Sequence, residues 1–313
     1  MAILNRTLLM IALAACSAFA ADSDLLSLVS PDAKVVAGIH VDRSTASQFG
    51  QFLLKQMQRE DADFNKFVLA TGFDPRRDLT EVIVSSSDVQ QKGHGLVVAR
   101  GTFDIAKLTA QSKLSGGSIT NYKDVQVIVG KSAGWIAFLD NRTAAAGDAD
   151  LVRTAIDRRG AGVGIDQKLA AKVNEVSGQY DAWMVSIAPM SKFSGKLPDQ
   201  RMNGVINGEM VQGIEQASGG VVFGATVRIA GEAVTRSEKD ATALADVVRF
   251  LAGMVQMNRE KPEVAKLAAV LDTMSLKATA NTLTFSLSVP EGDLEQLVKP
   301  ARNGTVRRVS VQK

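Results

Sequence analysis

Short β-rich runs alternate with amphipathic helical segments along this chain, and this alternation constrains the fold more than any other feature. Apolar residues at every second position favour strands, and apolar residues three or four positions apart favour helices. In the first half these patterns predict a strand at 34–41, helices at 47–57 and 61–69, strands at 81–85 and 95–100, a helix at 103–110, strands at 125–129 and 135–139, and a helix at 149–159.

The second half repeats this order of elements with little residue identity. The patterns there predict a strand at 181–187, a short helix at 210–216, strands at 220–230 and 232–236, helices at 239–257 and 262–271, a hairpin of strands at 275–280 and 283–289, and a helix at 293–298. We therefore expect an α+β fold with an internal duplication: two similar repeats, each an antiparallel β-sheet covered by helices on one face.

These elements divide the chain into an α+β repeat at 24–160, a linker region at 161–178 and a second α+β repeat at 179–300. The glycine-rich run 160–164 favours a boundary there. Residues 301–313 are expected to form a basic flexible tail, because they include lysine and arginine but no acidic residue. A solvated tail is the simpler interpretation, and docking to an anionic lipid or cell-wall polymer is the alternative.

Residues 1–20 have the pattern of an export signal peptide. Arg6 and the free amine form a positive end, the apolar run 7–15 is too short to span a bilayer, and small residues follow. An Ala-Phe-Ala motif that ends at Ala20 predicts cleavage before Ala21, which would become the first residue of the mature chain.

Cys16 offers a second interpretation of this region. The Leu-Ala-Ala-Cys motif that ends at Cys16 resembles the lipobox of bacterial lipoproteins, in which a lipid-modified cysteine becomes the first residue. Cys16 is the only cysteine, so cleavage before Ala21 leaves no thiol for disulfides, thiol catalysis or metal binding. No later stretch approaches 18 apolar residues, so no transmembrane segment is expected in the mature chain. We expect a periplasmic or extracellular protein, or alternatively a membrane-anchored lipoprotein.

The charge distribution argues against nucleic acid as a partner. The chain has 36 basic and 33 acidic residues, which are scattered along its length and leave a net charge of +3. A nucleic-acid surface needs clustered positive charge. Aromatic residues make up only 5% of the chain, which leaves few rings to stack on bases or sugars.

Residues 70–79 (ATGFDPRRDL) carry a resemblance to known proteins. This run and the Ala-Gly-Asp motif that ends at Asp148 are similar to segments of uncharacterised secreted or periplasmic bacterial proteins with duplicated α+β domains. The resemblance is short, and it implies architecture and export but no reaction. Local chemistry also explains the run, because Gly72 can end a helix, Pro75 can fix a turn, and Asp78 can bind backbone donors.

Histidine and serine motifs for catalysis or metal binding are missing from the sequence. The only histidines are His40, expected to be structural within an apolar strand, and His94, expected to be solvated in a turn. They show neither HxH nor HExxH spacing, and no GxSxG pentapeptide occurs. Ser132 ends a Gly-Lys-Ser run like that of a phosphate-binding loop, but Val125 stands where the first glycine belongs. No cofactor and no metal are therefore expected.

Carboxylates are the remaining candidates for chemistry. Asp140, Asp148 and Asp150 follow a predicted strand and could bind Ca²⁺ or act as an acid–base pair, although helix capping by Asp148 is the simpler role. Asp74 and Glu81 complete the set on which a carboxylate-based hydrolase would draw.

Methionines in the middle of the chain could line an adaptable apolar groove, or they could be ordinary core residues. They are Met184, Met190, Met202 and Met210. The glycine-bearing run 203–220 is expected to be flexible.

We expect a non-enzymatic binding or envelope-structural protein that acts on an unknown protein or envelope component. The cleft between the two halves is the candidate surface, because domain interfaces often hold ligands. The alternatives are a hydrolase that uses carboxylates alone and a surface lipoprotein that assists envelope assembly and carries lipid on Cys16.

Overall fold

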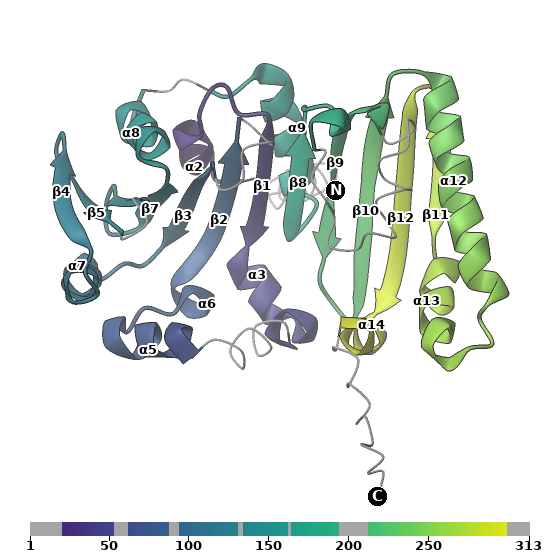
Figure 1. The fold of residues 1–313 in the computed structure, drawn as a ribbon, viewed down its shortest axis with the longest axis horizontal. Coiled ribbons are helices and arrows are strands. Elements are labelled where there is room, and N and C mark those ends of the chain that lie inside the picture. Colours follow the sequence, from purple (N-terminus) through teal and green to yellow (C-terminus); the bar gives the residue numbers. More distant parts are fainter. Residues whose placement is uncertain are drawn as a thin grey trace, which may run out of the picture.

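A computed structural model describes residues 21–52, 62–87, 94–130, 134–161, 164–193 and 212–298. The predicted signal peptide with Cys16 and Ala20, the predicted basic tail, Met202 and Met210 lie outside these ranges, as does the Lys-Ser pair of the 130–132 motif. Within them the strands form one 12-stranded antiparallel sheet in the order β11-β12-β10-β9-β8-β1-β2-β3-β7-β6-β5-β4 (Figure 1).

The first half of the chain supplies seven strands of this sheet. They are β1 (Val35–His40), β2 (Leu79–Ser86), β3 (Leu96–Gly101), β4 (Ser118–Tyr122), β5 (Val125–Val129), β6 (Trp135–Phe138) and β7 (Thr143–Gly147). The helices up to the second half are α2 (Ser23–Leu28), α3 (Val41–Ala46), α5 (Ala62–Thr71), α6 (Pro75–Asp78), α7 (Ile105–Leu114), α8 (Ala149–Arg158) and α9 (Gln167–Ser177).

The second half supplies the other five strands. They are β8 (Ala182–Ser186), β9 (Ile214–Val222), β10 (Thr226–Thr235), β11 (Ser275–Thr279) and β12 (Thr282–Pro290). Its helices are the 3₁₀ turn η1 (Met190–Phe193), α12 (Glu238–Met257), α13 (Pro262–Asp272) and α14 (Glu291–Val298). The α+β fold class predicted from the sequence is thus confirmed.

The two halves join through a strand pair, so the two predicted sheets are one. β1 pairs with β8 in antiparallel register, with Gly38 opposite Trp183. The Trp183 ring lies over Gly38, where an added Cβ would sit 2.4 Å from Cζ2 of the ring. Because real Cβ atoms do not approach other atoms that closely, the central strand needs glycine at this position.

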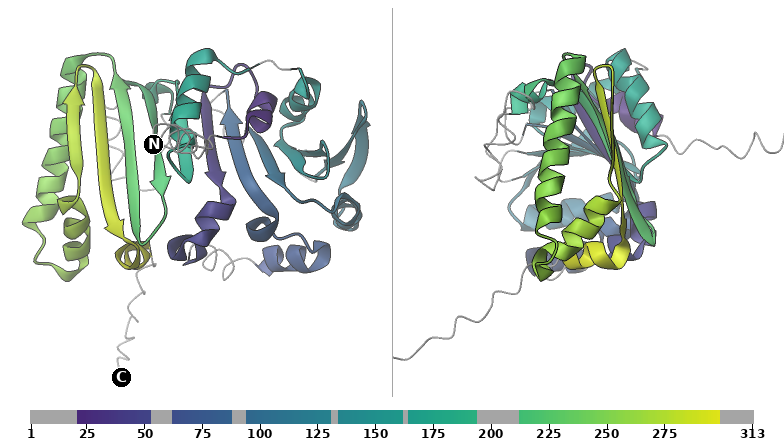
Figure 2. Two further views of the ribbon diagram at one scale, coloured as in Figure 1. Left: turned by 180° about the vertical axis from the view of Figure 1, so that it is seen from behind. Right: turned by 90° about the vertical axis from the view of Figure 1, so that its right-hand side faces the viewer.

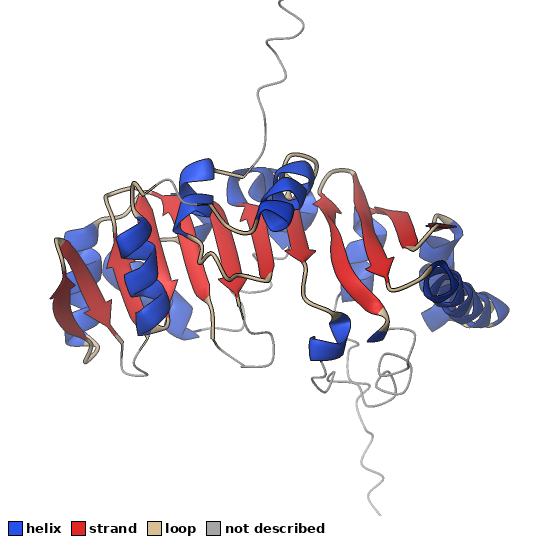
Figure 3. Cartoon of the chain, turned by 90° about the horizontal axis from the view of Figure 1, so that it is seen from above, coloured by secondary structure: helices blue, strands red, loops and turns tan. Residues whose placement is uncertain are grey.

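Helices cover both faces of the sheet (Figures 2 and 3), and in the first half both faces are covered, whereas one covered face was predicted for each repeat. The largest core packs Val98 and Trp183 of the sheet against the buried apolar residues of α2, α8 and α9. Ala99 points the other way, because successive strand residues alternate between faces, and it packs with Leu108 of α7. The second half is covered on that opposite face, where α12 packs on β12.

Both halves contain a strand, an antiparallel strand pair and a helix in the same order, β1, β2, β3 and α7 in the first and β8, β9, β10 and α12 in the second, although α3, α5 and α6 lie between β1 and β2 and, among the described residues, only η1 lies between β8 and β9. This shared order agrees with the predicted internal duplication, which itself stays a prediction. The first half adds strands β4 and β7, which the sequence patterns did not indicate.

Three further segments differ from their predictions. The strands predicted at 220–230 and 232–236 are divided elsewhere, because β9 ends at Val222 and β10 runs without a break from Thr226 to Thr235. The predicted linker 161–178 contains α9, which is capped by the Asp166 side chain and buries Leu169 and Val173. The predicted short helix at 210–216 is mostly strand, because β9 begins at Ile214. β9 also takes up the second part of the run 203–220 that was expected to be flexible.

No helix among the described residues is both long enough and apolar enough to cross a bilayer.

Candidate functional site

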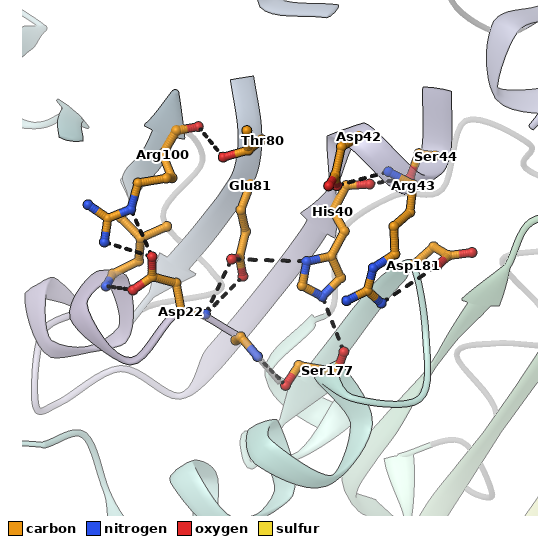
Figure 4. A network of polar contacts seen from close by, with 12 residues as sticks. Asp22, His40, Asp42, Arg43, Ser44, Thr80, Glu81, Arg100, Ser177 and Asp181 are labelled. Atoms are coloured by element: carbon orange, nitrogen blue, oxygen red, sulfur yellow. Dashed lines mark hydrogen bonds and ion pairs between the residues drawn. The ribbon is translucent and has the colours of Figure 1, made fainter. Parts of the chain in front are cut away.

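Buried polar side chains gather where β1, β2 and β3 meet the first described residues and the end of α9 (Figure 4). We call Asp22, His40, Glu81, Arg100 and Ser177 the central polar network. His40 and Glu81 lie opposite each other on β1 and β2, and only 6% and 8% of their surfaces are exposed. His40 Nδ1 is 4.0 Å from Glu81 Oε2, which is too long for a hydrogen bond.

Burial is the main influence on the protonation of both groups. Burial raises the pKa of Glu81 to about 7, although its hydrogen bond from the Asp22 backbone N–H opposes the shift. Burial also lowers the pKa of His40, although a hydrogen bond to the Ser177 carbonyl opposes it. Burial disfavours the charged form of each side chain, so near pH 7 His40 is mostly neutral and Glu81 is only about half ionised.

Backbone and side-chain bonds hold the residues before α2 against the sheet. The Asp22 N–H donates to both Glu81 carboxylate oxygens, at 3.2 and 3.3 Å. The Asp22 carboxylate caps α2 and accepts from Arg100 Nε at 2.8 Å. Arg100 Nη1 donates to Thr143 Oγ1 at 2.6 Å. The network therefore ties three strands to the beginning of α2.

A cavity of about 660 Å³ adjoins this network, and we call it the α2–α9 cavity. Its apolar lining residues are Leu26, Leu28, Leu139, Ile165 and Ala170. Its charged and polar lining residues are Ser23, Asp24, Ser27, Arg100, Asp140, Thr143, Arg159 and Asn174. Arg100 and Thr143 thus belong both to the buried hydrogen bonds and to the cavity wall.

The position of this cavity differs from the cleft predicted between the halves. Its walls come from the first half and from α9, and no residue of strands β8 to β12 lines it. A smaller hollow of about 260 Å³ lies where Val176 and Tyr180 meet β9, β10 and β12. The larger cavity is the better candidate site because it has both volume and a mixed lining.

The predicted acid–base carboxylates do not converge. Of the five, only Asp140 lines the α2–α9 cavity, and none lines the smaller hollow. Glu81 is buried in the network, and Asp150 lies in the first turn of α8. The part of the chain that the structure describes contains no group of three or more His, Cys, Asp or Glu side chains placed to hold a metal.

Asp148 and His94 form a pair that the sequence did not predict. Asp148 occupies the N-cap position of α8, but its side chain makes no capping bond there. It instead contacts His94 Nδ1 at 2.8 Å and accepts the Gly95 N–H at 3.2 Å. His94, expected to be solvated, therefore has a carboxylate partner.

The charged residues at 74–78 form hydrogen bonds and ion pairs with one another. Asp74 caps α6, accepting the Arg76 N–H at 3.1 Å and Arg76 Nε at 2.6 Å. Arg77 pairs with Asp78 at 2.7 Å. Hydrogen bonds from Arg76 hold the pKa of the Asp74 carboxyl below its usual value. These contacts match the capping role rather than an anion site.

The described methionines do not form a common groove. Met190 packs on the core cluster of α12, β9 and β12, whereas Met184 is 48% exposed on β8. Sequence reasoning missed Asp22, Arg100 and Ser177 as members of the site, because they lie in segments far apart in the chain. The helical spacing of apolar residues in α9 was the one signal that could have placed Ser177 on a packed element.

Comparisons with known proteins identify a shared fold. No protein-family model matches the chain, and no curated protein matches it significantly. Crystal form III of TP0453 is similar, with a TM-score of 0.54 and 8% identity over 89% of this chain and 98% of that chain. Form I gives a TM-score of 0.52, also at 8% identity, over 89% and 97%. At this identity the likeness shows the fold alone: the chain shares the α+β architecture of TP0453 over most of its length.

Proposed function

We propose that this chain is an exported, non-enzymatic binding protein that holds a small amphipathic molecule in the α2–α9 cavity. The observation that carries the proposal is the cavity itself. Its volume of about 660 Å³ lies within the range of small-molecule sites, roughly 300–1,000 Å³. Such sites combine an apolar lining with a few polar groups that orient the ligand, which is the composition found here.

The chemistry of the wall defines the class of ligand. Leu139 and Ile165 offer an apolar surface, while Thr143 and Asn174 offer hydrogen-bonding groups. Two arginines and two aspartates line the same cavity, so their charges balance. Arg100 is moreover already paired with Asp22 at 2.7 Å. A ligand with an apolar body, hydrogen-bonding groups and no net charge fits this wall best.

The same geometry argues against the hydrolase alternative. Acid–base hydrolysis needs two carboxyl groups that face one substrate. Glu81, the carboxyl with the raised pKa, lines neither described cavity, and its oxygens already accept the Asp22 N–H. The periplasmic or extracellular location belongs to this proposal, as an expectation from the signal sequence.

A pair of neighbouring substitutions tests the proposal. Ala170 lines the cavity, and Ala171 is exposed on the same helix outside it. We would titrate the uncharged dye N-phenyl-1-naphthylamine into the wild type, Ala170→Phe and Ala171→Phe. Saturable binding at one site that weakens at least about tenfold in Ala170→Phe alone is expected. Absence of dye binding to the wild type, or equal binding to both variants, would contradict the proposal.

A further inference from the structure

Ala21, the first described residue, is buried like a core residue. Ala21 is 6% exposed and belongs to the main hydrophobic core. Its backbone N–H donates to Ser177 Oγ at 2.9 Å, and Ser177 is fully buried. A hydrogen bond across 156 residues thus fixes the backbone nitrogen of Ala21.

The surroundings of this nitrogen are rich in acceptors. The next residue, Asp22, donates its N–H to the Glu81 carboxylate, which therefore lies within roughly 7 Å of the Ala21 nitrogen by chain geometry. The Ser177 carbonyl oxygen is 3.2 Å from His40 Nε2 (Figure 4).

The cations nearby already face other carboxylates. Arg100 of β3 pairs with Asp22 at 2.7 Å, and Arg43 of α3 lies 3.9 Å from Asp181. His40 of β1 is buried, and burial favours its neutral form. Glu81 of β2 is therefore a buried carboxyl whose direct hydrogen bonds come from a backbone N–H.

Ala21 is also the residue that the sequence predicts as the first of the mature chain. Cleavage there turns an amide N–H with one proton into an α-ammonium with three. We propose that the central polar network is a binding site for this α-amino group, with Ser177 Oγ and the Glu81 carboxylate as its acceptors. Removal of the signal thereby adds a buried cation beside Glu81 and completes the mature fold.

This α-amino site does not depend on the ligand proposed for the α2–α9 cavity. An ammonium beside Glu81 favours the ionised carboxylate, so the pKa of Glu81 falls below about 7 after processing. The carboxylate in turn raises the pKa of the α-amino group above its usual value of about 7.7–8.0. Processing at Cys16 would leave Ala21 within a peptide bond, and no such effect would follow.

The test compares chains that differ only at the Ala21 nitrogen. We would prepare residues 21–313 with a free amine and with an acetylated amine, and measure melting temperatures at pH 7. Acetylation is expected to lower the melting temperature by about 4 °C. Glu81→Gln should abolish this difference, whereas Glu232→Gln, which removes a carboxylate from β10, should leave it intact.

A direct titration guards against a general effect on folding. With ¹⁵N-alanine labelling, the α-amino group of Ala21 should titrate at least about one pH unit above its usual value. Intact mass of the protein exported by a Gram-negative host should show a chain that begins at Ala21. An ordinary amine pKa with no melting difference, or a mature chain that begins at lipid-modified Cys16, would overturn the inference.

Discussion

Replacing Gly38 by alanine should strain the strand pair that joins the two halves and destabilise the protein. The new Cβ would lie 2.4 Å from Cζ2 and 2.6 Å from Cε2 of Trp183. Ordinary contact begins at 3.4 Å, so the ring or the strand must move by about 1.0 Å, the difference between 3.4 and 2.4 Å. Trp183 is 3% exposed and surrounded by core residues, which leaves the ring little room to move.

The expected loss follows from two opposing effects. Overfilling a packed core costs about 1–3 kcal/mol. Alanine regains about 0.5–1 kcal/mol, because it restricts the unfolded chain more than glycine does. We therefore expect Gly38→Ala to lower the free energy of unfolding by about 1–2 kcal/mol.

A double-mutant cycle with Trp183→Phe identifies the cause. The smaller ring removes the atoms that the new Cβ would touch, and it also removes Nε1, a buried donor without a hydrogen-bond partner among the described residues. An unpaired buried N–H costs about 1–3 kcal/mol, which partly offsets the lost packing of the indole. In the Trp183→Phe background, Gly38→Ala should cost about 1 kcal/mol less than in the wild type.

Urea unfolding followed by far-UV circular dichroism would measure the four free energies. The comparison requires similar slopes of free energy against urea concentration in all four proteins. Costs that add within about 0.5 kcal/mol would refute the proposed contact between the methyl group and the indole. So would a Gly38→Ala protein as stable as the wild type.

Three further substitutions test the polar contacts. In the chain acetylated at its N-terminus, the contribution of Glu81 to stability is fully present below pH 4.5 and is lost as the pH rises through about 7, because burial raises the pKa of the folded-state carboxyl. At pH 8, urea unfolding should therefore show Glu81→Gln to be more stable than its acetylated parent by about 3 kcal/mol. Asp104→Ala removes the cap that accepts the Lys107 N–H at 3.1 Å, and calorimetry should show a loss of about 1 kcal/mol. Arg158→Met removes a buried donor to the Ser27 carbonyl at 3.0 Å; it should destabilise the protein by about 1–3 kcal/mol, and a neutral result would contradict that role.

Local patterns predicted those elements whose stability is local. The helix 239–257 carries its apolar residues at helical spacing, and α12 matches it to within one residue at the start. The hairpin at 275–289 also matches β11 and β12 closely, because a short turn fixes the pairing of its own strands. Such elements can be predicted without reference to the remaining chain.

Contacts between distant segments could not be predicted in the same way. The run at 34–41 predicts a strand, but its residues do not indicate which strands lie beside it. In the structure one edge of β1 pairs with β2 and the other with β8. The glycines at 160–164 favour a linker there, whereas the apolar spacing that follows them belongs to α9. The site depends on such contacts, since the hydrogen bond between Ala21 and Ser177 joins residues 156 positions apart.

The pairing of β1 with β8 also determines when the growing chain stops being prone to self-association. Synthesis proceeds from the N-terminus, so β1, β2 and β3 exist well before residues 182–186 have been made. Until then β1 is an apolar edge strand whose N–H and C=O groups on one side have no partner, and such edges pair readily with other chains. Chains that stop between β3 and β8 should therefore aggregate through β1. The edge of β1 that joins the two halves of the complete sheet is thus the edge most prone to aggregation in the incomplete sheet.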